Sequence, residues 1–398
     1  MINDRHLGEE QIGRAARGAA IRMKTPLAWL NLLHQRARSS VAVAGVAFAV
    51  VLVLLQLGFL ASVRQTATRI YDHLDFDLLL ASPEYLHLSK ASTIPRSRLT
   101  QAASLPGVTG TSGLNIGFQL WRNVETGQRR GILLMAFDPR DRVIALPEVA
   151  DQQEQLGKAD TVLVDRLSRS EFGPKQAGVT TEVGRRSVHV TGDFALGTGF
   201  SADGALLASN ATFFRLLPFR KPGEISLGLV RLAPGTDPDA VAAELRSILP
   251  RDVHVMTRDE IAAHERRHWM TKTSVGIIFG LGVLVALLVG TSIVYQVLSS
   301  DISSRLAEFA TLKAMGYSRQ YLSWLVLQQA LILALAGFLP GLLLAEMLYQ
   351  LTERMTHIPI EMTLTRACGV LLLSVVMCGL SGLASMAKVN SADPADLF

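Results

Sequence analysis

Cysteine is nearly absent from this sequence. Only two occur in 398 residues, at Cys368 and Cys378, and the long polar stretch in the middle of the chain has none. That absence excludes a disulfide framework in the polar stretch. Charged residues are also scarce: they make up 18% of the chain, whereas soluble domains carry about a quarter. This composition favours a membrane protein.

The sequence also lacks a loop for hydrolysing nucleotides. The pattern G-x-x-x-x-G-K-[ST] occurs nowhere, because the only Gly-Lys pair, Gly157-Lys158, is followed by Ala159. The string from Gly197 to Ala202 resembles a dinucleotide-binding glycine pattern, but it opens no predicted helix and favours a turn followed by a hairpin. No cofactor is therefore expected, and an ATP-driven activity would need an ATPase on another polypeptide.

Apolar residues gather in four charge-free blocks. Each is long enough to cross about 30 Å of hydrocarbon as a helix. A charge at the centre of such a helix costs about 2.5–3.5 kcal/mol, so four charge-free windows predict four membrane-spanning helices. The first block is too long, and begins too far into the chain, to be a cleaved signal peptide. The predicted spans are 41–63, 273–300, 320–345 and 367–387.

Basic residues flanking these blocks predict the orientation. The positive-inside rule places the N-terminus, the 301–319 loop and the 388–398 tail in the cytoplasm. The 64–271 segment and the short 346–366 loop then lie outside. The net charge of +5 is read as a topology signal, because no aromatic-interleaved basic face suited to nucleic acid accompanies it. The orientation rests on Arg5, Arg14, Arg17, Arg22, Lys24, Arg36 and Arg38 before the first span, and on Arg305, Lys313 and Arg319 in the 301–319 loop.

The N-terminal region divides in two. Thr25-Pro26 is a helix start signal, and the apolar residues that follow predict an amphipathic helix over 25–40 at the membrane interface. Residues 1–24 are expected to be disordered in the cytoplasm. Met23 is an alternative start to Met1, and the sequence leaves this open.

The 64–271 segment alternates strand-like and helix-like stretches. Its clearest unit is a strand over 225–232, a helix over 238–249 and a strand over 252–256. A counterpart is expected near its start, with a strand from Asp77, a helix over 97–104 and a strand over 108–120. Further strands are predicted over 131–138 and 186–196. The fold class is therefore a four-helix membrane protein with a large mixed α/β extracytoplasmic domain between helices 1 and 2.

His264-Glu265-Arg266-Arg267-His268 forms the metallopeptidase pattern H-E-x-x-H. On a helix it would place His264 and His268 one turn apart, with Glu265 as the base on a zinc-bound water. No further His, Asp or Glu follows until Asp301, across the membrane, so a third ligand is missing nearby. A charged juxtamembrane helix is the favoured interpretation, and a zinc peptidase is kept as an alternative.

The 301–319 loop contains a short amphipathic helix. Leu306 and Phe309 recur at helical spacing with other apolar residues, and Gly316 is a natural stop. On physical grounds alone, such a helix could lie on the lipid surface or dock in a cleft of a cytoplasmic partner. In the docked case the residues expected to contact the partner are Arg305, Leu306, Glu308, Phe309, Leu312, Lys313 and Gly316.

The string RLAEFATLKAMGYSRQYL (305–322) and the four-span layout resemble the MacB/FtsX-type permeases of ABC transporters. Further strings resemble the DevC-like permeases of the DevBCA exporters, and together they cover nearly the whole chain from Met23. The HERRH string departs from that resemblance, in which only a Glu and a Trp are typical here. The strings are KTPLAWLNL, WRNVETGQRRGILLMAFDP, FALGTGFSADG, IVYQVLSSDIS, LKAMGYSRQYL, LILALAGFLPG and ADPADLF.

The resemblance implies a non-enzymatic permease subunit of a tripartite exporter in the bacterial inner membrane. Its implied partners are a DevA-like ABC ATPase, a DevB-like membrane fusion protein and a TolC-like outer-membrane channel, with the permease itself a homodimer surrounded by lipid. The 301–319 helix would be the coupling helix, through which ATPase closure moves the outer domains by mechanotransmission. An FtsX-like regulator of a periplasmic hydrolase is the alternative, and the exported substrate, glycolipid or other, is left open.

Overall fold

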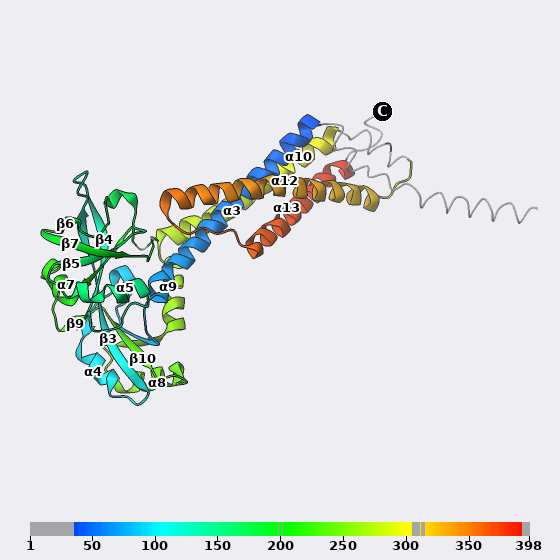
Figure 1. The fold of residues 1–398 in the computed structure, drawn as a ribbon. Coiled ribbons are helices and arrows are strands. Elements are labelled where there is room, and N and C mark those ends of the chain that lie inside the picture. Colours follow the sequence, from blue (N-terminus) through cyan, green and yellow to red (C-terminus); the bar gives the residue numbers. More distant parts are fainter. Residues whose placement is uncertain (1–35, 198, 201, 305–310, 312–314, 392–398) are drawn as a thin grey trace, which may run out of the picture. The chain divides into compact units, whose positions relative to one another are not determined.

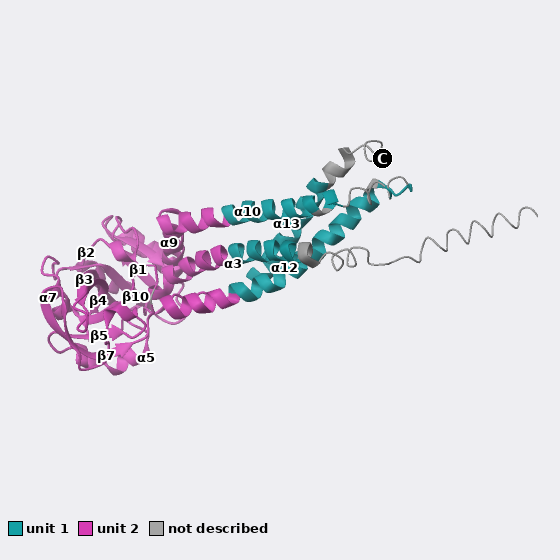
Figure 2. Cartoon of the chain, turned by 90° about the horizontal axis from the view of Figure 1, so that it is seen from above, with its two compact units in different colours: residues 1–54, 284–345, 363–398 teal, residues 55–283, 346–362 magenta. Residues whose placement is uncertain are grey.

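The computed structural model describes residues 36–197, 199–200, 202–304, 311 and 315–391. The chain divides into two compact units (Figure 2). One comprises residues 1–54, 284–345 and 363–398, and the other comprises residues 55–283 and 346–362. The predicted N-terminal segments 1–24 and 25–40 lie almost wholly outside the described residues.

Four helices in the described part of the chain are long and apolar enough to cross a membrane (Figure 1). The candidate spans within them are Ser40–Asp72, Ser274–Ser304, Gln320–Thr356 and Leu364–Ser385. The predicted fold class, four such helices with a mixed α/β domain between the first two, is confirmed. The helices are α3 (Arg36–Asp72), α10 (Ser274–Ser304), α12 (Arg319–Thr356) and α13 (Leu364–Ser391).

Glycines let the helices of the first unit approach closely. A Cβ on Gly337 of α12 would lie 2.5 Å from Cβ of Val46 on α3, and one on Gly341 would lie 2.9 Å from Cβ of Val50. In lipid, apolar burial does not drive helices together, so close van der Waals packing at small residues has to hold them. The spacing of Gly337 and Gly341 is the small-xxx-small arrangement that provides such packing.

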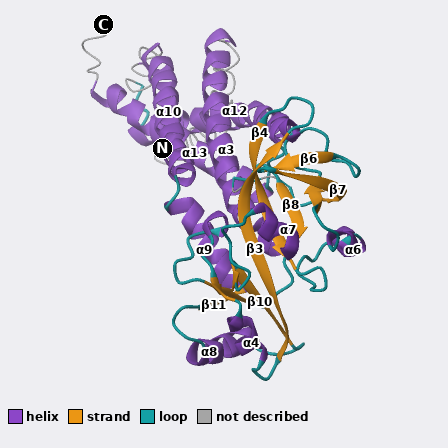
Figure 3. Ribbon diagram, turned by 90° about the vertical axis from the view of Figure 1, so that its left-hand side faces the viewer, coloured by secondary structure: helices purple, strands orange, loops and turns teal. Residues whose placement is uncertain are grey.

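The α/β domain contains the predicted strand–helix–strand units (Figure 3). The sheet order β11-β1-β10-β3 interleaves them, because β10 pairs antiparallel with both β1 and β3. This is a split β-α-β arrangement. The elements involved are β1 (Leu78–Ala81), α4 (Ser97–Ala103), β3 (Val108–Arg122), β10 (Leu227–Leu232), α8 (Pro238–Ile248) and β11 (His254–Thr257).

Further strands close into a ring beside this unit. Strand β3 is shared: Val108–Leu114 pairs with β10, and Asn115–Arg122 pairs with β4. The ring continues through β8, β5, β7 and β6, and the pairing of Trp121 with Val183 returns it to β3. Its elements are β4 (Arg129–Phe137), β5 (Thr161–Asp165), β6 (Thr180–Val183), β7 (Arg186–Phe194), β8 (Ala205–Ser209) and α7 (Asn210–Leu216).

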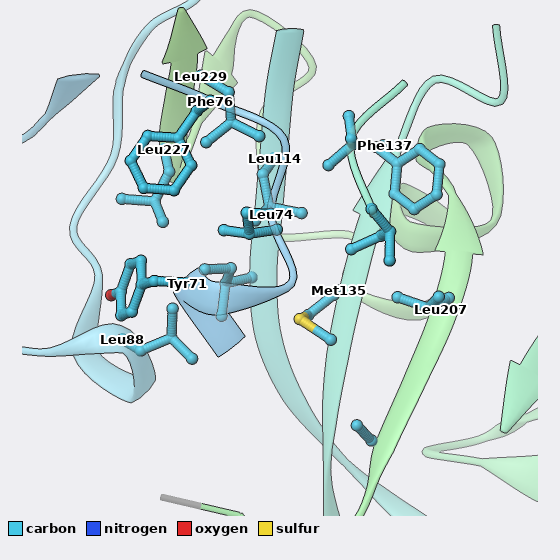
Figure 4. Close-up of a cluster of buried hydrophobic side chains, with 14 of the residues drawn as sticks. Tyr71, Leu74, Phe76, Leu88, Leu114, Met135, Phe137, Leu207, Leu227 and Leu229 are labelled. Carbon is cyan, nitrogen blue, oxygen red and sulfur yellow. The ribbon is translucent and has the colours of Figure 1, made fainter. Parts of the chain in front are cut away.

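The alternation of side chains along each strand divides the domain into separate cores. Leu78 and Leu80 of β1 face the cluster formed with α4 and α8, whereas Leu79 faces the opposite cluster. That opposite cluster also contains Tyr71 from the last turn of α3 and Leu74 just after the helix (Figure 4). The remaining described elements are η1 (Leu88–Lys90), β2 (Ile94–Pro95), α5 (Pro147–Asp151), α6 (Gln153–Leu156), η2 (Ser170–Phe172), β9 (Glu224–Ile225) and α9 (Arg258–Thr271).

Candidate functional site

The end of α3 and the helix α9 meet in the α/β domain, and we call this meeting the junction. It consists of Tyr71, Tyr85, Leu88, Arg258 and Glu265. Tyr71 is 1% exposed, and the chain just beyond it enters the large apolar core. Helix α9 begins at a capping box in which Thr257 and Glu260 bond each other's backbone N–H groups. The T-x-x-E sequence therefore fixes where α9 starts.

Arg258, in the first turn of α9, binds the last turn of α3 and the chain just beyond it. Its Nη1 donates to the Tyr71 carbonyl at 2.9 Å, and its Nη2 donates to the carbonyls of Leu74 at 3.0 Å and Phe76 at 2.7 Å. The guanidinium also lies 4.3 Å from the centre of the Phe76 ring. The Tyr71 carbonyl belongs to the last turn of α3, where the helix carries partial negative charge, whereas Leu74 and Phe76 follow the helix end at Asp72. The guanidinium reaches all three carbonyls because its donors form a planar fork.

Glu265 makes the second attachment. Its Oε1 accepts hydrogen bonds from the Tyr71 hydroxyl at 2.9 Å, from the Leu88 backbone N–H at 3.0 Å, and from the Tyr85 hydroxyl. The side chain is fully buried. Burial raises the pKa of Glu265, while the hydrogen bonds from the tyrosines and Leu88 act in the opposite direction. One carboxylate thus ties α9 to α3 and to the segment before η1.

Hydrogen bonds to Asp165 hold the start of the stretch around Gly197 within the α/β domain. Asp165 at the end of β5 is fully buried, and its carboxylate accepts the backbone N–H groups of Leu196 and Gly197, each at 3.0 Å. Gly197 has a φ of +90°, a conformation that residues with a Cβ rarely adopt. We call residues 196, 197, 199, 200 and 202–204 the docking loop.

The docking loop contacts α3 and α10 within the same compact unit. A Cβ on Gly199 would lie 2.8 Å from Cβ of Thr66 on α3, so the backbone sits directly against that helix. Phe200 meets the Phe279 ring of α10 edge-on at 6.1 Å, and Phe279 stacks on Phe59 of α3 at 5.1 Å. The loop therefore links the strand ring to the outer ends of the first two long helices.

The residues predicted to contact an ATPase lie mostly outside the described residues. This applies to Arg305, Leu306, Glu308, Phe309, Leu312 and Lys313. Gly316 is described and has a φ of +89°, which is typical of a glycine that ends a helix. Contact with an ATPase stays a prediction for all seven positions.

The H-E-x-x-H string is spread over different contacts. His264 Nε2 lies 3.0 Å from the Leu86 carbonyl oxygen, His268 stacks on His87, and Glu265 is held by the junction. Within the described residues, no group of three or more His, Cys, Asp or Glu side chains is placed to hold a metal ion. The arrangement gives Glu265 a structural role and does not support the zinc-peptidase alternative.

Sequence reasoning missed Arg258, Tyr71, Tyr85 and Phe200. One signal was available for Glu265, because Ile261, Glu265 and Trp269 recur every four residues and form the buried face of α9. No local pattern indicates the partners of Arg258. They are carbonyls near the start of the α/β segment, at Tyr71, Leu74 and Phe76.

Two family models match the chain. The MacB-like periplasmic core domain matches residues 39–248, and the FtsX-like permease C-terminal domain matches residues 280–394. The chain belongs to the MacB/FtsX-type family of ABC transporter permeases. Permeases of this family are not themselves catalytic and work with an ABC ATPase partner. For this permease, the predicted family is confirmed at that level, and the closer DevC-like assignment stays a prediction.

Solved structures similar to the permease cover its extracytoplasmic part. The periplasmic region of MacB from Actinobacillus actinomycetemcomitans is 13% identical with a TM-score of 0.34, covering 49% of this chain and 94% of that one. The extracellular domain of the noncanonic ABC-type transporter YknZ from Gram-positive bacteria is 12% identical with a TM-score of 0.33, covering 46% and 100%. A permease domain from Porphyromonas gingivalis is 14% identical with a TM-score of 0.30, covering 46% and 87%. No curated protein sequence matches the permease.

Proposed function

We propose that this permease is the transmembrane subunit of an ATP-driven exporter. A separate ATPase on the cytoplasmic side supplies the energy, and the permease converts it into movement of its extracytoplasmic domain. The N-terminus, the 301–319 loop and the C-terminal tail face the cytoplasm. The excess of Arg and Lys beside these segments supports this orientation.

The observation that carries the proposal is the continuity of α3. It runs as one helix from Arg36 to Asp72, about 55 Å at 1.5 Å per residue, which exceeds the roughly 30 Å of a bilayer core. Its last turn contributes Tyr71 to the core of the α/β domain, and Leu74 follows directly. A packed core is stiff, so a displacement of α3 along or about its axis has to move the domain.

The second long helix reaches the same place through α9. Helix α9 ends at Thr271 and α10 begins at Ser274, with the Thr273 hydroxyl donating to the Trp269 carbonyl at 2.6 Å. Arg258 and Glu265 bind α9 to the end of α3. A movement of either α3 or α10 would therefore reach the α/β domain through the same junction. The docking loop adds a separate contact to the strand ring.

The exporter would act within a larger assembly. We propose a homodimer with a DevA-like ATPase, a DevB-like membrane fusion protein and a TolC-like outer-membrane channel. In this scheme domain movement drives substrate already outside the inner membrane, and the permease performs no chemistry of its own. An FtsX-like regulator would use the same junction to activate a cell-wall hydrolase.

A charge substitution in the 301–319 loop tests the coupling. Phe309→Asp should lower the vanadate-sensitive ATPase activity that co-purifies with the tagged full-length chain by at least about tenfold, because a carboxylate at a buried apolar contact is expensive. Ser303→Asp, which adds the same charge at an exposed position of α10, is the matched control and should retain the activity.

Both variants must fractionate with the membrane, as measured by immunoblot. Wild-type ATPase activity in Phe309→Asp would remove the proposed coupling contact. Lost activation of a cell-wall hydrolase in that variant, with no exported substrate lost, would favour the regulator over the exporter.

A further inference from the structure

Four consecutive residues, from Tyr85 to the first residue of η1, contact α9. Tyr85 and Leu88 donate hydrogen bonds to Glu265. The Leu86 carbonyl oxygen lies 3.0 Å from His264 Nε2, and the His87 ring packs on His268. The two rings of that last pair, which we call the histidine stack, have centroids 4.8 Å apart and planes 30° from parallel. Trp269 packs edge-on against the His87 ring, with the two ring centroids 5.7 Å apart.

The titratable groups around the histidine stack are mostly basic. Lys90 acts on both rings, while Lys272 and the His264 imidazole are neighbours of His268. Glu265 is the acidic group of the cluster, and its carboxylate is directed toward Tyr71, Tyr85 and Leu88 N–H rather than toward the stack. Tyr71 and Tyr85 are neutral, because burial raises the pKa of both hydroxyls well above the usual value. A proton added to either ring therefore meets positive neighbours.

We propose that the histidine stack is an acid-sensitive latch, in which protonation of His87 and His268 separates residues 84–90 from α9. Two imidazolium rings at this distance repel each other, and because both rings are partly buried, water screens the repulsion only in part. Opening would leave Arg258 and the Tyr71–Glu265 hydrogen bond as the attachments between α9 and the end of α3. Any effect of the latch on coupling rests on the proposed function, whereas the opening itself does not.

The pKa values of the two histidines determine how the stability of the closed contact changes with pH. Burial, with help from His268 and Lys90, lowers the pKa of His87 to about 4, and burial also lowers the pKa of His268. The open state therefore takes up protons below about pH 6.5 while the closed state resists them, so the contact is fully stable above pH 6.5 and weakens as the pH falls toward 4. Glu265 acts in the opposite direction, because its raised pKa favours the closed contact at low pH.

Hydrogen exchange of the full-length chain in lipid nanodiscs measures the opening. Mass spectrometry of peptides covering residues 84–90 at pH 7.5 and pH 5.0, corrected for the intrinsic pH dependence of exchange, reports the protection of Leu88 N–H. Full linkage from the His87 shift would give about a thirtyfold increase in opening at pH 5.0, and the half-exposed side chain reduces this to roughly tenfold.

Two variants and one control make the result specific. His87→Phe keeps a stacked ring that cannot take a proton and should lose most of the pH effect, as should His268→Gln. His254→Gln, at an exposed position of β11, should keep the wild-type response. Unchanged protection of the wild type at pH 5.0, or an equal pH effect in all three variants, would overturn the latch. Phe309→Asp should leave this exchange unaltered, so the latch and the proposed function can fail independently.

Discussion

Replacing Arg258 with alanine should loosen the attachment of α9 to the end of α3. The substitution removes three hydrogen bonds to the carbonyls of Tyr71, Leu74 and Phe76, together with the cation over the Phe76 ring. It also removes the positive charge that faces the negative end of the helix dipole. The packing of the core behind Tyr71 is left intact.

The size of the effect can be worked from these contacts. A hydrogen bond contributes about 0.5–1.5 kcal/mol net, and the ring contact about 0.5–1 kcal/mol at an exposed site. Water can replace part of each, because the Arg258 side chain is only partly buried. We expect a loss of about 2–4 kcal/mol, which corresponds to roughly 5–15 °C in Tm for a domain of this size.

Thermal unfolding of the full-length chain in nanodiscs, followed by tryptophan fluorescence, measures this loss. Trp269 lies on α9 and reports on the junction. Arg258→Lys should fall between wild type and alanine, because an ammonium lacks the planar fork that reaches three carbonyls. Arg251→Ala, which removes an exposed arginine on the turn before β11, is the control. A Tm for Arg258→Ala equal to that of Arg251→Ala would refute the reasoning.

Two further substitutions test the other contacts. Gly199→Val should push against Thr66 and cost about 1–3 kcal/mol through overpacking, with Thr66→Gly restoring part of the Tm, whereas Gly131→Val on β4 has open space and should be close to neutral. Glu265→Leu should cost about 2–4 kcal/mol at pH 8 because three buried donors lose their acceptor, while Glu265→Gln keeps an acceptor and should cost less than about 1 kcal/mol. Since burial raises the pKa of Glu265, the wild type should also lose stability as the pH rises through that pKa and Glu265→Gln should not. Equal Tm values for Gly199→Val and Gly131→Val, or for Glu265→Leu and wild type, would contradict these assignments.

The sequence by itself determined the four long apolar helices and most regular elements of the outer domain. The four apolar blocks predict membrane helices, because a charged side chain within hydrocarbon is costly and these blocks contain none. The predicted helix over 238–249 corresponds to α8 at Pro238–Ile248, and the predicted strand over 131–138 corresponds to β4 at Arg129–Phe137. Such elements follow from local periodicity and start signals, which a single sequence contains.

Only the tertiary structure decided what joins these elements. The H-E-x-x-H string suggested a zinc ligand set, but the fold turns Glu265 toward Tyr71 and Tyr85, which lie 194 and 180 residues earlier in the chain. Arg258 likewise finds its carbonyl partners at and just beyond the end of α3, and no local sequence pattern connects them to it. The physical reason is that hydrogen bonds and ring contacts act over a few ångströms in space, while periodicity reports only on neighbours along the chain. The residues of the junction are therefore far apart in the sequence, and they form a site only when folding brings α3 and α9 together.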